Sequence, residues 1–178
     1  DFEIYGKNID VLDSYTYLGI VFNYNGSFCS ARKKLLEQSN KALYALYRKI
    51  RNIAIPVDIQ LKLFDCLILP IMIYSSEVWG FENKQGLERM HLQFCKNILH
   101  VRKSTPNFMV YGELGRYPID ITIKLRMVMF WNDMLSSENK LSNTLYRLMI
   151  QLHQSKPTHF KWVTYIKSIF DECGLTFI

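Results

Sequence analysis

Residues 27–51 place the strongest constraint on the fold of this 178-residue chain, because their pattern predicts one long, amphipathic and basic helix. At about 100° per residue, six apolar side chains gather along one side of that helix. They are Phe28, Ala31, Leu35, Ala42, Leu46 and Ile50. A helix of this kind buries its apolar side and leaves the other side to solvent or to a ligand. The rest of the chain must therefore supply a core for it.

Basic side chains lie on the opposite side of the predicted helix. Lys34, Lys41 and Arg48 are seven residues apart, close to two helical turns, so they form a straight row. Lys33 and Arg51 fall beside this row. We predict that these five residues bind a nucleic-acid backbone, because its phosphates attract Lys and Arg whatever the base sequence. A solvated face without a ligand is the alternative interpretation of the same pattern.

The excess positive charge of the chain is confined to this one segment. Residues 27–51 hold seven basic residues and one acidic residue, a balance of +6. The whole chain holds 22 basic and 16 acidic residues, also +6, so the remainder holds 15 of each and cancels to zero. This concentration of charge favours the binding interpretation over the solvated face.

Composition predicts a globular protein that keeps its cysteines reduced. Apolar residues make up 49% of the chain, and there are 11 Phe, 11 Tyr and 3 Trp, enough for a substantial core. The four cysteines are far apart and form no CxxC pair, which indicates an intracellular location, nuclear or cytoplasmic. The most apolar run, residues 66–74, is shorter than the roughly 20 residues that span a bilayer, so we expect no membrane partner. The chain opens on Asp1, without an initiator Met, so we expect it to belong to a longer protein.

The order of the patterns predicts a mainly α fold of the α+β class. Residues 2–24 are rich in aromatic and β-branched residues and predict short antiparallel strands. About six to seven helices follow as a bundle, each with an apolar side. Besides 27–51, the helical stretches are 57–79 (interrupted at Pro70), 87–101, a short helix after Thr105-Pro106, 119–135, 141–153 and 160–173. The apolar side of 141–153 carries Leu141, Leu145, Leu148 and Leu152.

Two local features leave more than one interpretation open. Gly112 and Gly115 indicate either a close backbone approach to a neighbouring helix or a helix end. Glu77 lies in the apolar stretch 71–79, which we expect to be central in the core. We predict a surface carboxylate at a helix end there, with a buried ion pair as the alternative.

The chain lacks the motifs of a catalyst. It contains no paired-carboxylate, Ser-His-Asp, phosphate-loop or dinucleotide motif, and no adjacent aspartates that could hold catalytic Mg²⁺. His91, Cys95 and His100 have a spacing that could touch a metal, but no fourth ligand lies near them in the sequence. We therefore predict ordinary packing for these three, with no catalytic residue, no metal site and no cofactor in this chain.

Several segments resemble a known family. They are YTYLGIVFNYNGSF (15–28), ALYALYRKI (42–50), LFDCLILPIMIYSSEVWG (63–80) and TPNFMVYGELGRYPI (105–119). Together they resemble the region downstream of the polymerase palm in reverse transcriptases of non-LTR (LINE-type) retrotransposons, over roughly residues 2–150. The most specific part is a pair of motifs. The first is Y-x-S-E-x-W-G at residues 74–80, and the second is TPN-x-x-VYGELGR, which begins about 30 residues after the first begins, at Thr105.

The resemblance implies a place in a larger polymerase. Residues 1–26 would be the strand tail of the palm, 27–103 a thumb-like unit with the basic helix, and 104–178 a helical connector. The polymerase aspartates and their Mg²⁺ would lie upstream, so this chain alone would not catalyse. Its partners would be the palm of the same polyprotein and the backbone of an RNA–DNA or RNA template–primer. An orphaned α-helical protein-interaction module, with no nucleic-acid role, is the alternative.

Overall fold

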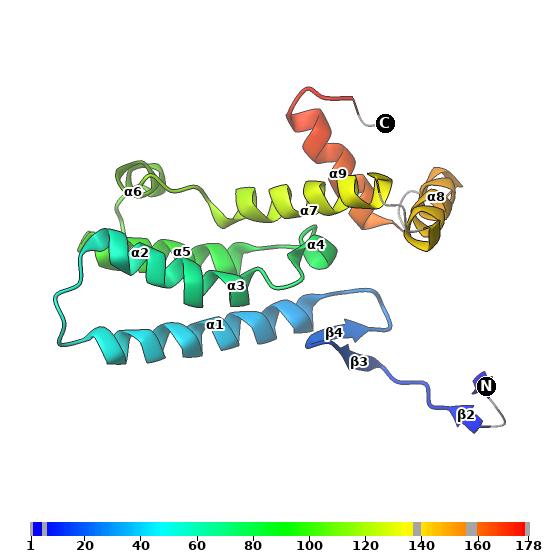
Figure 1. The fold of residues 1–178 in the computed structure, drawn as a ribbon, viewed down its shortest axis with the longest axis horizontal. Coiled ribbons are helices and arrows are strands. Elements are labelled where there is room, and N and C mark those ends of the chain that lie inside the picture. The colour runs from blue at the N-terminus through cyan, green and yellow to red at the C-terminus, as the bar shows by residue number, and fades with distance from the viewer. Residues whose placement is uncertain (1, 5–6, 137–139, 156–159, 177–178) are drawn as a thin grey trace.

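The computed structural model describes residues 2–4, 7–136, 140–155 and 160–176. It confirms the predicted class, because short antiparallel strands precede a mainly helical body (Figure 1). The strands are β1 (Phe2–Ile4), β2 (Lys7–Ile9), β3 (Ser14–Tyr17) and β4 (Ile20–Asn23). The helices are α1 (Cys29–Ile50), α2 (Val57–Leu67), α3 (Leu69–Met72), α4 (Ser76–Trp79), α5 (Gln85–Ile98), α6 (Asn107–Leu114), α7 (Ile119–Ser136), α8 (Lys140–Ser155) and α9 (Lys161–Glu172). Within the described ranges, seven of them have eight or more residues.

The strands form two separate hairpins rather than one sheet. β1 pairs with β2, and β3 pairs with β4, both antiparallel. The apolar run from Tyr15 to Tyr24 folds back on itself between Tyr17 and Ile20, which are directly opposite each other. Leu18 and Gly19 form this two-residue loop with φ of 46° and 85°, the positive values that a tight hairpin of the right twist requires.

Helix α1 begins two residues later than the sequence indicated. Phe28 holds the N-cap position, and no side chain provides a capping hydrogen bond there. The Ser27 hydroxyl instead accepts the Cys29 N–H at 3.2 Å. The Phe28 N–H is bound by the Glu82 carboxylate at 2.8 Å, so a residue distant in sequence helps to fix the start of the helix.

The core lies between three layers of helices. In Figure 1, α1 forms one layer, α2, α3 and α5 the middle layer, and α7 the next. α1 packs on α3, α5 and β4, and α7 packs on α4, α5, α8 and α9. The stretch 71–79 is central, as predicted, because Met72 and Trp79 are fully buried. One cluster of buried side chains runs from Ile20 through to Ile169, so all the layers share it.

The close helix approach occurs at Gly80, not at Gly112 or Gly115. A Cβ on Gly80 would lie 2.5 Å from Ile123 Cγ2 on α7, closer than real contacts allow. No neighbouring atom lies within 4 Å of a Cβ placed on Gly112 or Gly115. Gly115 ends α6 with φ of 61°, so the helix-end interpretation was the right one for that residue.

Glu77 forms the ion pair that was the alternative prediction. Its carboxylate accepts the Arg126 guanidinium of α7 at 2.9 Å, with the Glu77 side chain 27% exposed. The Glu77 carbonyl also accepts the Trp162 indole N–H of α9 at 2.7 Å. Glu77 therefore combines parts of both interpretations, because it lies partly exposed in the first turn of α4 and is paired with an arginine 49 residues away.

The predicted apolar side of α8 does not face the core. Leu141, Leu145, Leu148 and Leu152 are 47–66% exposed. The helix is turned so that Tyr146 and His153 are buried instead, and Tyr146 Oη accepts the Trp131 indole N–H of α7 at 2.8 Å. In the part of the chain that the structure describes, no helix is both long enough and apolar enough to cross a membrane.

Candidate nucleic-acid interface

The structure brings the five predicted phosphate-binding residues together on the outer side of α1. Lys33, Lys41, Arg48 and Arg51 are exposed, and Lys34 is half-buried. Because α1 is one uninterrupted helix whose C-cap, Arg51, keeps helical backbone angles, the five side chains follow a single side of it. We call this set the basic face of α1.

Packing of the opposite side fixes the direction of the basic face. Ala31, Leu35 and Leu46 are at most 7% exposed and fill the core beneath β4, α3 and α5. The buried Ser39 hydroxyl donates to the Leu35 carbonyl at 2.8 Å, so it needs no partner outside the helix. Rotation of α1 would expose these side chains, so the cations cannot turn inward without loss of core packing.

None of the five cations forms an ion pair with a carboxylate of the described residues. Arg32 differs, because its guanidinium binds Glu82 at 2.8 Å and therefore belongs to the structural contacts of α1. One acid, Glu37, is exposed on the same side of the helix. The positive charge of the basic face is thus left available to an external anion.

Tyr44 is a member of this surface that sequence analysis missed. Its side chain is 64% exposed, and it lies three residues after Lys41 and four before Arg48. Its helical position, on the same side as these two cations, was the signal that could have identified it. An exposed ring beside cations can stack on a base whose phosphates the cations bind.

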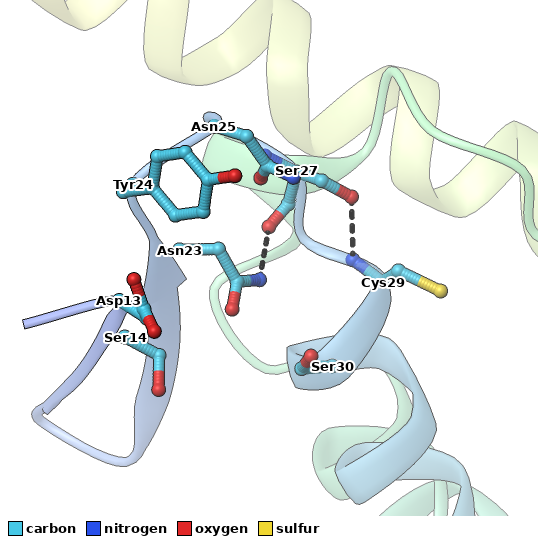
Figure 2. A pocket seen from close by; sticks show the side chains of 8 residues that line it. All are labelled: Asp13, Ser14, Asn23, Tyr24, Asn25, Ser27, Cys29 and Ser30. Atoms are coloured by element: carbon cyan, nitrogen blue, oxygen red, sulfur yellow. Dashed lines mark hydrogen bonds between the residues drawn. The ribbon is translucent and has the colours of Figure 1, made fainter.

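A polar pocket of about 390 Å³ lies where β4 leads into α1 (Figure 2). The Asn23 amide donates to the Ser27 carbonyl at 2.6 Å, and this bond shapes the turn that forms one wall. The lining residues are Asp13, Ser14, Asn23, Tyr24, Asn25, Ser27, Cys29 and Ser30. They include one carboxylate and no cation, so the pocket offers hydrogen-bonding groups and lacks the carboxylate pair of a two-metal site.

The possible metal ligands of α5 do not come together. His91 and Cys95 are buried, whereas His100 is exposed at the end of the helix. His91 is stacked on Phe64, with ring centroids 5.4 Å apart. Neither ring nitrogen of His91 has a hydrogen-bond partner among the described residues. Within those same residues, no three His, Cys, Asp or Glu side chains gather as a metal site would require.

Burial controls the protonation of this cluster. It lowers the pKa of His91 to about 4, with the nearby Arg116 guanidinium as the second cause. It also raises the pKa of the Cys95 thiol to about 11, so that thiol is not a nucleophile at neutral pH.

The Glu88 carboxylate accepts both the Tyr111 hydroxyl and the Ile119 N–H, and thereby joins α5 to α6 and α7. These are packing and bridging roles.

No protein-family model, no curated protein and no solved structure matches this chain. Support for a function therefore comes from the sequence resemblance and from the charge and exposure of α1.

Proposed function

We propose that this chain holds the sugar–phosphate backbone of RNA or of an RNA–DNA duplex, as the thumb and connector of a LINE-type reverse transcriptase. The observation that carries the proposal is the basic face, five cations on one side of α1 without an ion-pair partner among the described residues. The polymerase aspartates and their Mg²⁺ would lie in the palm upstream. The role of this segment is then to hold the substrate while the palm performs the chemistry.

The length of the basic face suits a nucleic-acid strand. Lys34 and Arg48 are 14 residues apart, which is about 21 Å at the rise of an α-helix. Along a duplex axis, one strand carries a phosphate about every 3.4 Å. The row therefore spans about six phosphates, and each of its cations can reach a different one. Such contacts position a substrate without reading its sequence, which a polymerase requires.

The decisive experiment removes the row and measures salt dependence. In the variant Lys34→Gln/Lys41→Gln/Arg48→Gln, affinity for an RNA–DNA hybrid should fall. The slope of log K against log salt should flatten by up to about 0.9 for each lost phosphate contact. A matched control removes three exposed cations outside α1, Lys62→Gln/Arg147→Gln/Lys161→Gln, and lowers the net charge equally.

Fluorescence anisotropy over a series of salt concentrations provides both quantities. An equal loss of affinity in the two triple variants would mean that only the net charge of the chain matters. Unchanged affinity in Lys34→Gln/Lys41→Gln/Arg48→Gln would show that the basic face does not bind the hybrid. Tyr44→Ala adds a finer comparison. Loss of one stacked base should cost about 1–3 kcal/mol on a single-stranded RNA, with a smaller cost on a fully paired hybrid.

A second candidate function is protein binding through α8. Leu141, Leu145, Leu148 and Leu152 follow the 4-3-4 spacing of a coiled-coil seam and lie at least 47% exposed. An exposed apolar stripe of this kind is typical of an interaction surface. This observation favours the interaction-module alternative, and it is compatible with nucleic-acid binding because α8 and the basic face of α1 are different surfaces.

A further inference from the structure

A second group of cations converges on a pocket far along the chain from α1. The pocket has a volume of about 310 Å³ and lies between α5 and the loop that joins α5 to α6. Its lining includes Arg89, Leu92, Lys96, Val101, Lys103 and Asn107. Three of them are cations and none is a carboxylate. A count of charges does not reveal this pocket, because acidic residues elsewhere in the chain balance these cations.

The cations of this pocket are left without acidic partners. Arg89 and Lys96 are seven residues apart on α5 and therefore share one side of it. Lys103 comes from the loop. None of the three forms an ion pair with a carboxylate of the described residues. By contrast, Lys84 and Arg116, on either side of them in sequence, bind Asp120 and Asp65 at 2.9 and 2.6 Å.

The protein itself holds Lys96 in position. Its ammonium group donates to the Lys103 carbonyl at 2.8 Å and to the Asn107 side-chain oxygen at 3.0 Å. An ammonium has three donors, so one remains for a ligand. The same two bonds draw the loop against α5, and the Val101 N–H also donates to the Lys96 carbonyl, at 3.1 Å. The cation is therefore preorganised, which lowers the entropic cost of binding an anion.

We propose that this pocket binds a phosphate group, carried by a nucleotide or by a nucleic-acid backbone. Three converging cations match a multiply charged anion better than a single carboxylate. The volume is at the lower end of ligand pockets, about the size for one small phosphate-bearing unit. Leu92 and Val101 give the wall an apolar part on which a sugar or base can lie. The proposal concerns a surface other than the basic face and does not depend on the function of α1.

The test uses Arg89→Gln/Lys103→Gln, because these two side chains are exposed and Lys96 also stabilises the loop. The matched control is Lys62→Gln/Lys161→Gln, which removes two exposed cations elsewhere. Inorganic pyrophosphate is titrated into each chain, with the amide resonances of α5 and the 99–107 loop as the readout. We expect pyrophosphate to shift these resonances in the control, and the first variant to bind about tenfold more weakly.

A second titration identifies the source of the phosphate. A short single-stranded RNA is added in the background Lys34→Gln/Lys41→Gln/Arg48→Gln, so that the basic face of α1 contributes little. If RNA binding in this background is weakened by Arg89→Gln/Lys103→Gln, the pocket binds a backbone phosphate. If these substitutions weaken the binding of pyrophosphate but not of RNA, the pocket binds a nucleotide or free phosphate. The proposal is overturned if both probes bind Arg89→Gln/Lys103→Gln as tightly as the control.

Discussion

Substitution of Gly80 by Ala tests how α4 packs against α7. Gly80 is buried at the end of α4, and its N–H donates to the Ser76 carbonyl at 2.7 Å. An added Cβ would lie 2.5 Å from Ile123 Cγ2, 2.5 Å from the Ser76 carbonyl oxygen and 2.7 Å from Met127 Sδ. The Met127 side chain can move, but the Ser76 oxygen belongs to the backbone of α4 itself. Relief of the clash therefore requires a shift of the α4 backbone near Gly80 as well as movement of Ile123 and Met127 on α7.

The expected loss of stability follows from this geometry. Insertion of a methyl group into a packed core costs about 1–3 kcal/mol, and occasionally more. Because a backbone atom is among the three contacts, we expect a value near the upper end, about 3 kcal/mol. In a chain of this size, 1 kcal/mol shifts Tm by about 2–4 °C, so the Tm of Gly80→Ala should fall by about 6–12 °C.

Gly112→Ala is the matched control, because the same methyl group enters open space there. Gly112 lies inside α6, is exposed, and has no neighbour within 4 Å of the added Cβ. Ala in a helix is favoured over Gly by about 0.5–1 kcal/mol, so this variant should be more stable than the wild type. Urea unfolding followed by circular dichroism measures both changes. If Gly80→Ala is as stable as the wild type, or the two variants change stability in the same direction, the close packing of α4 on α7 is refuted.

Two further predictions concern pH and self-association. The pKa of His91 is lowered to about 4, chiefly by burial and then by Arg116, and so lies below the unfolded value near 6.5. As pH falls, His91 is therefore protonated in the unfolded chain before it is protonated in the folded chain. Its contribution to the free energy of unfolding is complete above pH 6.5 and should be lost as pH falls toward 4, by up to about 3 kcal/mol. His91→Phe should remove this part of the pH dependence in urea titrations at pH 7 and pH 4.5, and an unchanged pH difference would contradict the assignment. For α8, sedimentation velocity should show that the wild-type chain self-associates as its concentration rises. The variant Leu145→Gln/Leu148→Gln should abolish this association, whereas the control Ile121→Gln/Leu125→Gln, on the exposed side of α7, should leave it intact. A wild-type chain that stays monomeric would count against the leucine stripe as an interface.

Local patterns were sufficient to predict α1 and the position of its basic face. An amphipathic helix of 22 residues has only one side that can be buried, so its apolar residues also determine where Lys34, Lys41 and Arg48 point. Most of the helices were equally accessible, because apolar periodicity and a break close to Pro70 are properties of neighbouring residues. The turn at Leu18-Gly19 and the break between α3 and α4 were not predicted. The nucleic-acid role of the basic face stays a proposal.

The tertiary structure decided everything that depends on partners distant in sequence. Arg32 is paired with Glu82, and Glu77 with Arg126, in both cases across about 50 residues. The pocket of Arg89, Lys96 and Lys103 exists only because the loop after α5 turns back onto that helix. A periodic pattern shows which side of a helix is apolar, but α8 has more apolar surface than one contact can bury. Which part stays exposed is set by the shape of the helix it meets, and that shape is absent from its own sequence.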